Sequence, residues 1–129
     1  MRFLLDTHAL IWALVEPERL SAAAQEIIED KSHELVVSSA SAWEIGTKFR
    51  LGRLPSLAHV VESYGERVAD LGATMLSITP KHAMYAGRLD WEHGDPFDRI
   101  LAAQSAIENL TLVTRDQSLR RLSSIQTIW

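Results

Sequence analysis

The chain has 129 residues, of which 47% are hydrophobic and 23% charged, and its formal net charge at pH 7 is −4. This length fits a single domain over residues 1–129, and the acidic balance argues against a protein that coats nucleic acid by bulk electrostatics. The absence of cysteine excludes disulfides, thiolate catalysis and zinc–sulfur sites. No signal-peptide cleavage site and no apolar run of about 18 residues is present, so we expect a cytoplasmic protein without membrane association.

Short apolar runs alternate with helical patterns along the chain, which is typical of an α/β fold with a mostly parallel sheet covered on both faces. The patterns of the first half predict a strand over 2–5, helices over 7–15 and 21–30, a strand over 35–37, and helices over 40–51 and 57–71. Those of the second half predict a strand over 74–78, a helix opened by Thr79-Pro80, a helix from Asp95-Pro96 to about Asn109, and strands over 110–113 and 124–128.

Acidic residues follow the predicted strands, at the edge where open parallel sheets bind ligands. Asp6 directly follows the first strand, although an aspartate there can equally be the N-cap of the next helix. Glu44 lies in the second turn of the helix after the second strand, and its alternative role is a surface ion pair with Lys48 four residues on. Asp116 comes just after the fourth strand, where it can also cap the following turn.

Asp98 is the most informative of these acids because it begins a helix that is apolar around most of its circumference. Such a helix is largely buried, so an acid in its first turn is expected to point inward. The alternative is a favourable anion at a helix N-terminus. Asp95 is the better candidate for capping, since it directly precedes Pro96.

The predicted topology brings Asp6, Glu44, Asp98 and Asp116 toward one edge of the sheet. Packed carboxylates repel one another and raise each other's pKa unless a cation is present. Mg²⁺ or Mn²⁺ prefers such oxygen ligands, and acids that hold Mg²⁺ beside a phosphate are a recurring solution for phosphodiester hydrolysis. We therefore predict a catalytic metal site made by these four acids.

Four segments carry a resemblance to a known family: LLDTHALIWAL, SSASAWEIGTKFRLGRLP, HGDPFDRILAAQSA and LTLVTRD. Together they resemble the PIN-domain ribonucleases, and more closely the VapC toxins of bacterial toxin–antitoxin pairs. The resemblance implies a three-layer α/β/α sandwich that cleaves RNA with Mg²⁺ or Mn²⁺, with the family's acids at Asp6, Glu44, Asp98 and Asp116. It further implies a homodimer held inactive by a cognate VapB-like antitoxin. Gly94 departs from the pattern, because close relatives often carry arginine there.

Other functions remain open at this stage. A catalytically degenerate PIN-like binding module is one alternative. An aspartate-dependent phosphatase of the haloacid-dehalogenase type is another, but its chemistry needs a second aspartate two positions after Asp6, where this chain has His8. A phosphorylatable receiver domain would want paired acids after the first strand, and Asp6 is unpaired.

Five basic residues form a candidate rim for the RNA backbone. The alternative for any one of them is ordinary solvated surface charge. The rim candidates are Lys48, Arg50, Arg53, Arg99 and Arg115.

Overall fold

The computed structural model describes all residues from Met1 to Trp129, and its centre is one five-stranded sheet in the order β3-β2-β1-β4-β5. Every neighbouring pair of strands is parallel, so the sheet is wholly rather than mostly parallel. The last strand covers only two residues of the predicted range 124–128, and the others lie within two residues of their predicted bounds. The strands are β1 Arg2–Leu5, β2 Glu34–Ser38, β3 Ala73–Leu76, β4 Thr111–Val113 and β5 Thr127–Ile128.

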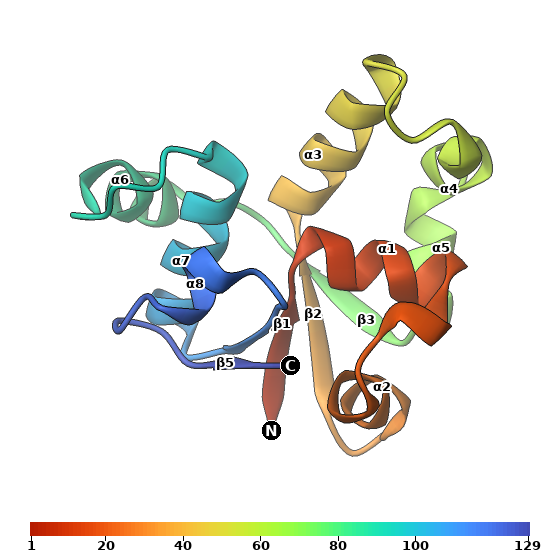
Figure 1. The fold of residues 1–129 in the computed structure, drawn as a ribbon, viewed down its shortest axis with the longest axis horizontal. Coiled ribbons are helices and arrows are strands. Elements are labelled where there is room, and N and C mark those ends of the chain that lie inside the picture. Colours follow the sequence, from red (N-terminus) through yellow and green to blue (C-terminus); the bar gives the residue numbers. More distant parts are fainter.

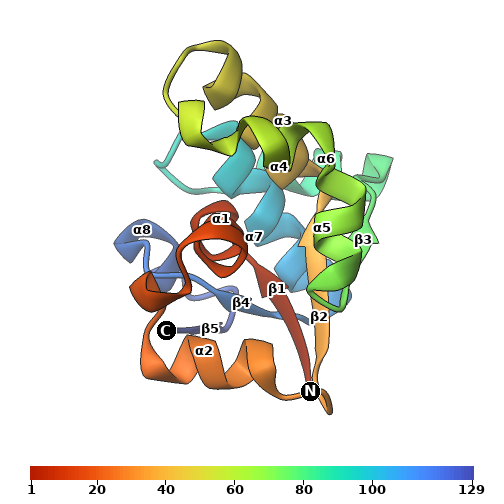
Figure 2. The ribbon, with the colours of Figure 1, turned by 90° about the vertical axis from the view of Figure 1, so that its right-hand side faces the viewer.

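Helices cover both faces of the sheet and give the predicted three-layer α/β/α arrangement. In Figure 1, α1, α2, α4 and α5 lie on the right of the sheet, α6 to α8 lie on its left, and α3 stands above the upper ends of β1 and β2. Figure 2 looks onto the side of α1, α2, α4 and α5. None of the helices is long and apolar enough to cross a membrane. Their bounds are α1 Thr7–Val15, α2 Ala22–Glu29, α3 Ser39–Arg50, α4 Ala58–Glu62, α5 Tyr64–Asp70, α6 Pro80–Arg88, α7 Pro96–Glu108 and α8 Gln117–Arg120.

The central strand β1 serves two cores because its side chains alternate between the two faces of the sheet. Phe3 and Leu5 pack into the larger core, under α1 to α5. Leu4 faces the opposite core and packs there with Leu101 of α7 and Leu119 of α8. All three β1 side chains are buried, as expected for a central strand of a parallel sheet covered on both sides.

Local capping explains where most helices begin. Thr79 accepts a hydrogen bond from the backbone of His82, whose ring in turn accepts one from the backbone of Thr79, and Pro80 occupies the first helical position of α6. Ser21 caps α2 in the predicted way. Asn109 ends α7 in the left-handed conformation with φ of 55°.

The predicted single helix over 57–71 is wrong, since the chain forms α4 and α5 with a break at Ser63. The glycine of this stretch, Gly65, lies inside α5 and not at the break. The Ser63 hydroxyl donates to the carbonyl oxygen of His59 at 2.7 Å, a local bond known to bend helices. The side chain of Arg67 then bonds the same hydroxyl, which stabilises the break.

Candidate active site

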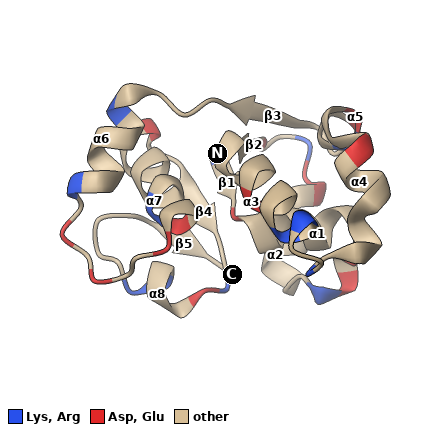
Figure 3. Cartoon of the chain, turned by 90° about the horizontal axis from the view of Figure 1, so that it is seen from above, with Lys and Arg blue, Asp and Glu red and all other residues tan.

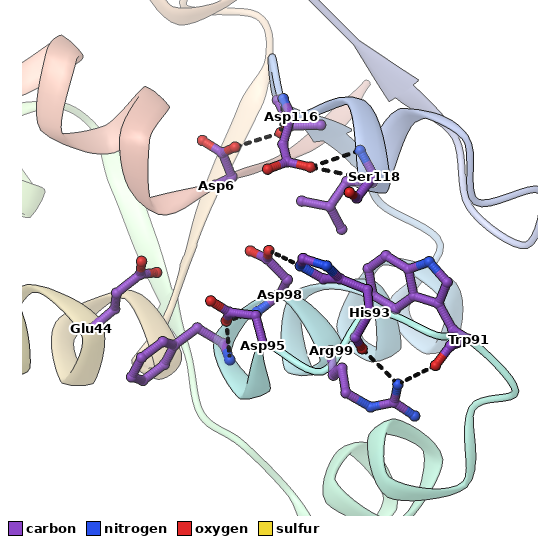
Figure 4. Close-up of polar contacts among 12 residues, drawn as sticks. Asp6, Glu44, Trp91, His93, Asp95, Asp98, Arg99, Asp116 and Ser118 are labelled. Atoms are coloured by element: carbon purple, nitrogen blue, oxygen red, sulfur yellow. Dashed lines mark hydrogen bonds and ion pairs between the residues drawn. The ribbon is translucent and has the colours of Figure 1, made fainter.

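Four acidic side chains lie around the carboxyl-terminal edge of the sheet. Asp6 directly follows β1, Glu44 lies on α3, Asp98 is in the first turn of α7, and Asp116 lies between β4 and α8. Figure 3 looks down onto this edge, and Figure 4 shows the four carboxylates around a common space between these elements. The topology therefore places the predicted acids on one edge, as expected from the strand-end rule.

Asp6 is both a helix cap and a buried member of this cluster. Its Oδ1 accepts a hydrogen bond from the backbone N–H of Ala9 at 2.7 Å, and its Oδ2 accepts one from the hydroxyl of Thr114. Only 5% of the residue is exposed. Burial raises the pKa of Asp6 above its usual value, and the negative charge of Glu44 raises it further, although the two hydrogen bonds oppose the shift.

Asp98 points toward Asp6 and Asp116 and leaves the capping of α7 to Asp95, as predicted (Figure 4). The Asp95 Oδ1 accepts hydrogen bonds from the backbone N–H groups of Phe97 and Asp98 at 2.9 and 3.1 Å. Burial raises the pKa of Asp98 to about 6, and the nearby charges of Asp95 and Asp116 add to that rise. A cation near Asp98 would relieve this cost.

His93 is a site residue that the sequence patterns do not reveal. Its Nε2 lies 2.7 Å from Oδ2 of Asp98, and its ring packs against Trp91 with ring centroids 4.8 Å apart. The hydrogen bond partly lowers the pKa of Asp98 against the effect of burial. The only sequence signal for His93 is its position, five residues before Asp98 in the loop that leads into α7.

Glu44 is buried rather than on the surface, with 5% of the residue exposed. Its Oε2 is 2.6 Å from the ammonium group of Lys48, so the predicted alternative pair exists, but in a part-buried setting. Trp43 of α3 meets Phe97 of α7 edge to face, with centroids 4.6 Å apart, and thereby joins the helices that carry Glu44 and Asp98.

Asp116 is the most exposed of the four acids. Its Oδ1 accepts hydrogen bonds from the backbone N–H groups of Ser118 and Leu119, so the predicted capping role at α8 is present. Its own N–H donates to the Thr114 hydroxyl at 3.0 Å, and that hydroxyl donates to Asp6. Thr114 thus ties the positions of Asp6 and Asp116 together.

Arg99 does not belong to the predicted basic rim, because its guanidinium makes four hydrogen bonds inside the protein. It donates to the carbonyl oxygens of Ala86, Trp91 and His93 at 2.9, 2.8 and 2.9 Å, and to that of Leu89. These bonds hold the segment that carries His93 against the start of α7 (Figure 4). Five fixed donors suit arginine to this task.

The acids fit a hard divalent cation by the chemistry of their donors. All four offer carboxylate oxygens, and two of them have a pKa raised by burial and by like charge. No three acidic or histidine side chains lie close enough together to form a complete metal site. Mg²⁺ keeps several of its waters and is commonly bound through one or two carboxylates, so a ready cluster of three is not required.

Comparison with known proteins gives a consistent result. Residues 3–125 match the PIN domain family model. The chain is 36% identical over 129 residues to Ribonuclease VapC22 of Mycobacterium tuberculosis, covering 98% of this chain and 97% of that protein. Ribonuclease VapC16 of the same organism is 32% identical over 71 residues, covering 52% of this chain and 50% of that protein.

Solved structures share the fold at lower identity. VapBC2 from Rickettsia felis, bound to a DNA fragment from its promoter, matches with a TM-score of 0.70 and 18% identity over 99% of this chain and 98% of that one. DNA-bound VapBC from Salmonella typhimurium matches with a TM-score of 0.68 and 21% identity over 99% and 97% of the two chains. By its family match and its similarity to VapC22 over nearly the whole length of both proteins, the chain belongs to the PIN-domain family and is a VapC-like member of it.

Proposed function

We propose that this protein is an endoribonuclease that hydrolyses RNA phosphodiester bonds with Mg²⁺ or Mn²⁺ at Asp6, Glu44, Asp98 and Asp116. The observation that carries the proposal is the placement of buried Asp6 and part-buried Asp98, each with a raised pKa, at the ligand-binding edge of the sheet. A protein keeps such costly carboxylates where a cation or a reaction uses them. The similarity to Ribonuclease VapC22 supports RNA as the substrate.

The chain's own residues account for how the site is held ready. Asp6 and Asp98 are the principal metal ligands in this proposal, and Glu44 and Asp116 complete the pocket directly or through water. When bound, a divalent cation stabilises charge on the phosphate and lowers the pKa of a water molecule. Thr114 fixes one oxygen of Asp6 by hydrogen bonding, and the backbone of Ala9 fixes the other. Both bonds orient the carboxylate in advance.

We further propose that the protein is the toxin of a VapBC-type pair and binds a VapB-like antitoxin. The similar structures from Rickettsia felis and Salmonella typhimurium are described as VapBC assemblies, and another similar structure is a toxin–antitoxin complex from Klebsiella pneumoniae. Copurification of this chain with the product of a neighbouring short reading frame, and loss of RNA cleavage in that complex, would be the expected result.

Removal of divalent cations is the direct test of the proposed reaction. Purified protein is expected to cleave single-stranded RNA in Mg²⁺, to lose that activity in EDTA, and to recover it when excess Mg²⁺ or Mn²⁺ is added. Gel analysis of end-labelled RNA measures the cleavage. Undiminished cleavage in EDTA would refute metal dependence, and no cleavage under any condition would favour the degenerate binding module.

The raised pKa of Asp98 predicts a pH-dependent stability. Between about pH 4 and pH 6 the folded protein keeps a proton on Asp98 that the unfolded chain has lost, so the free energy of unfolding is expected to fall as pH rises through this window. Mg²⁺ should therefore raise the melting temperature more at pH 7 than at pH 5. Saturation at about 100 times the dissociation constant corresponds to about 2.7 kcal/mol.

Thermal melts of the wild type and of Asp98→Asn, with and without Mg²⁺, separate this effect from other titrating groups. The variant should lose the part of the pH dependence that Asp98 contributes, together with most of the Mg²⁺ shift. An equal Mg²⁺ shift at both pH values in the wild type would contradict the assignment of Asp98 as a ligand.

A further inference from the structure

A groove leads away from the acid cluster along α1. A small cavity of about 150 Å³ is lined by Asp6, His8, Trp12, Arg115 and Asp116. It adjoins a second cavity of about 390 Å³, and the two share His8, Trp12 and Arg115. We call the second cavity the Trp12 groove; its polar lining includes His8, Glu16, Arg19, Lys48, Ser56 and Arg115.

Two arginines are held on the indole of Trp12 in this groove. The guanidinium carbon of Arg19 lies 4.6 Å from the ring centroid, and that of Arg115 lies 4.7 Å from it. Trp12 itself is buried, and its other contacts include Trp129 with centroids 5.8 Å apart. Cation–π stacking positions a guanidinium while leaving its N–H edges free for an anion.

The edges of these guanidinium groups are largely unused within the chain. Arg115 donates no hydrogen bond and forms no ion pair within the chain. Lys48 is the other predicted rim residue that lines the groove, and it is paired with Glu44. Arg19 has one partner, Glu16, at 3.4 Å and in an exposed setting. Such surface pairs contribute little to stability, so Arg19 can exchange its partner at small cost.

The charge of the groove contrasts with the acidic balance of the whole chain. Its lining contains three basic residues, Arg19, Lys48 and Arg115, and one carboxylate, that of Glu16. The charge of Lys48 is balanced by its pair with Glu44, so the two arginines give the groove its positive character. In Figure 3, basic segments lie beside α1 and α3, next to the acidic edge of the sheet. The groove adjoins the acid cluster through the residues that the two cavities share, and guanidinium groups bind phosphates in a fork-like geometry.

We propose that the Trp12 groove binds the backbone of single-stranded RNA beside the cleaved bond, with Arg115 on the phosphate nearest the acids and Arg19 on a phosphate further along. This inference rests on the proposed ribonuclease function and assigns the side on which the substrate chain runs. Arg115 stands between Thr114 and Asp116, so its phosphate would adjoin the reacting one. The contact is sequence-independent, as contacts to the RNA backbone are.

The test uses binding, which does not require cleavage. Fluorescence anisotropy of a labelled oligouridine about ten nucleotides long measures affinity for Asp98→Asn protein and for the same protein carrying Arg115→Ala, Arg19→Ala or Arg120→Ala. Arg120 is the matched control, because it is exposed on the neighbouring helix α8 and does not line the groove. Loss of one charged hydrogen bond is expected to weaken binding about tenfold for Arg115→Ala, with no change for Arg120→Ala.

Two further measurements identify phosphate as the ligand. Arg115→Ala should reduce the slope of log affinity against log salt by about 1. The Arg115→Ala substitution should also leave affinity unchanged for an oligouridine of the same length whose linkages are neutral methylphosphonates. Equal affinity of Arg115→Ala and Arg120→Ala for the ordinary RNA would overturn the proposal.

Other results separate this inference from the proposed function. RNA binding that depends on Arg115, in a protein that never cleaves RNA, would support the groove and refute the ribonuclease. Weakened association of Arg115→Ala with the VapB-like partner, at unchanged RNA affinity, would make the groove a protein-binding site and overturn the RNA proposal.

Discussion

Asp98→Asn is expected to reduce the RNA cleavage rate on the order of a hundredfold or more, whereas Asp95→Asn should stay close to wild type. The two carboxylates are three residues apart, but their surroundings differ. The Oδ1 of Asp95 accepts hydrogen bonds from two backbone N–H groups and so caps α7, a role that asparagine performs equally well. Asp98 faces Asp6 and Asp116 with a pKa raised to about 6, and asparagine removes its charge while keeping its shape.

Single-turnover cleavage of one RNA by both variants makes the comparison, and denaturation curves check that both are folded. Asp98→Asn can still hydrogen bond to His93, so the local structure should persist. Equal activity of the two variants would contradict the division between a capping acid and a catalytic one. Full activity of Asp98→Asn would remove it from the site.

Strands and helix starts could be predicted from the sequence because short-range interactions determine them. β1 is a four-residue strand whose last three residues are apolar and which ends at an acid. The Thr79-Pro80 and Asp95-Pro96 pairs mark the starts of α6 and α7 by the same local chemistry. The break between α4 and α5 was not predicted, because it depends on the Ser63 hydroxyl donating its hydrogen bond to the carbonyl oxygen of His59 and not to water. The apolar pattern is similar with or without that break.

The four acids could be predicted to lie on one edge, but not how each is held. For Asp6 and Asp116, a capping role and a place beside the other acids were treated as alternatives. In the structure each of these side chains caps a helix and also lies beside the other acids. Glu44 likewise keeps its ion pair with Lys48 and is still buried. A helix N-terminus at the end of a parallel strand faces the ligand edge, so capping there does not compete with a place in the site.

The contacts of His93 and Arg99 lie beyond sequence patterns because they depend on the path of an irregular loop. Nothing in the spacing of residues 86–93 indicates that four of their carbonyl oxygens converge on one guanidinium. Arg99 was therefore predicted as a rim residue from its charge alone. Because those carbonyl oxygens accept its hydrogen bonds, the Arg99 guanidinium is bound inside the fold and is not presented to solvent.

Arg99→Ala is expected to lower the free energy of unfolding by about 3 kcal/mol, since it removes a charged donor set from four part-buried carbonyl oxygens. Arg99→Lys should recover less than half of that loss, because an ammonium group cannot match the spread of the guanidinium donors. The matched control is Arg88→Ala, an exposed arginine on α6, for which a change within about 0.5 kcal/mol is expected. Urea unfolding measures all three.

Both Arg99 substitutions should also weaken RNA cleavage, whereas Arg88→Ala should not. Without Arg99 the segment carrying His93 loses its anchor, and Asp98 then loses the hydrogen bond that His93 makes to its Oδ2. The desolvated carboxylate would keep the influences that raise its pKa and lose one that lowers it. Cleavage by Arg99→Lys should therefore require a higher pH than cleavage by the wild type. A pH profile identical to that of the wild type, in a variant that is measurably destabilised, would show that the anchor supports the fold and has no influence on Asp98.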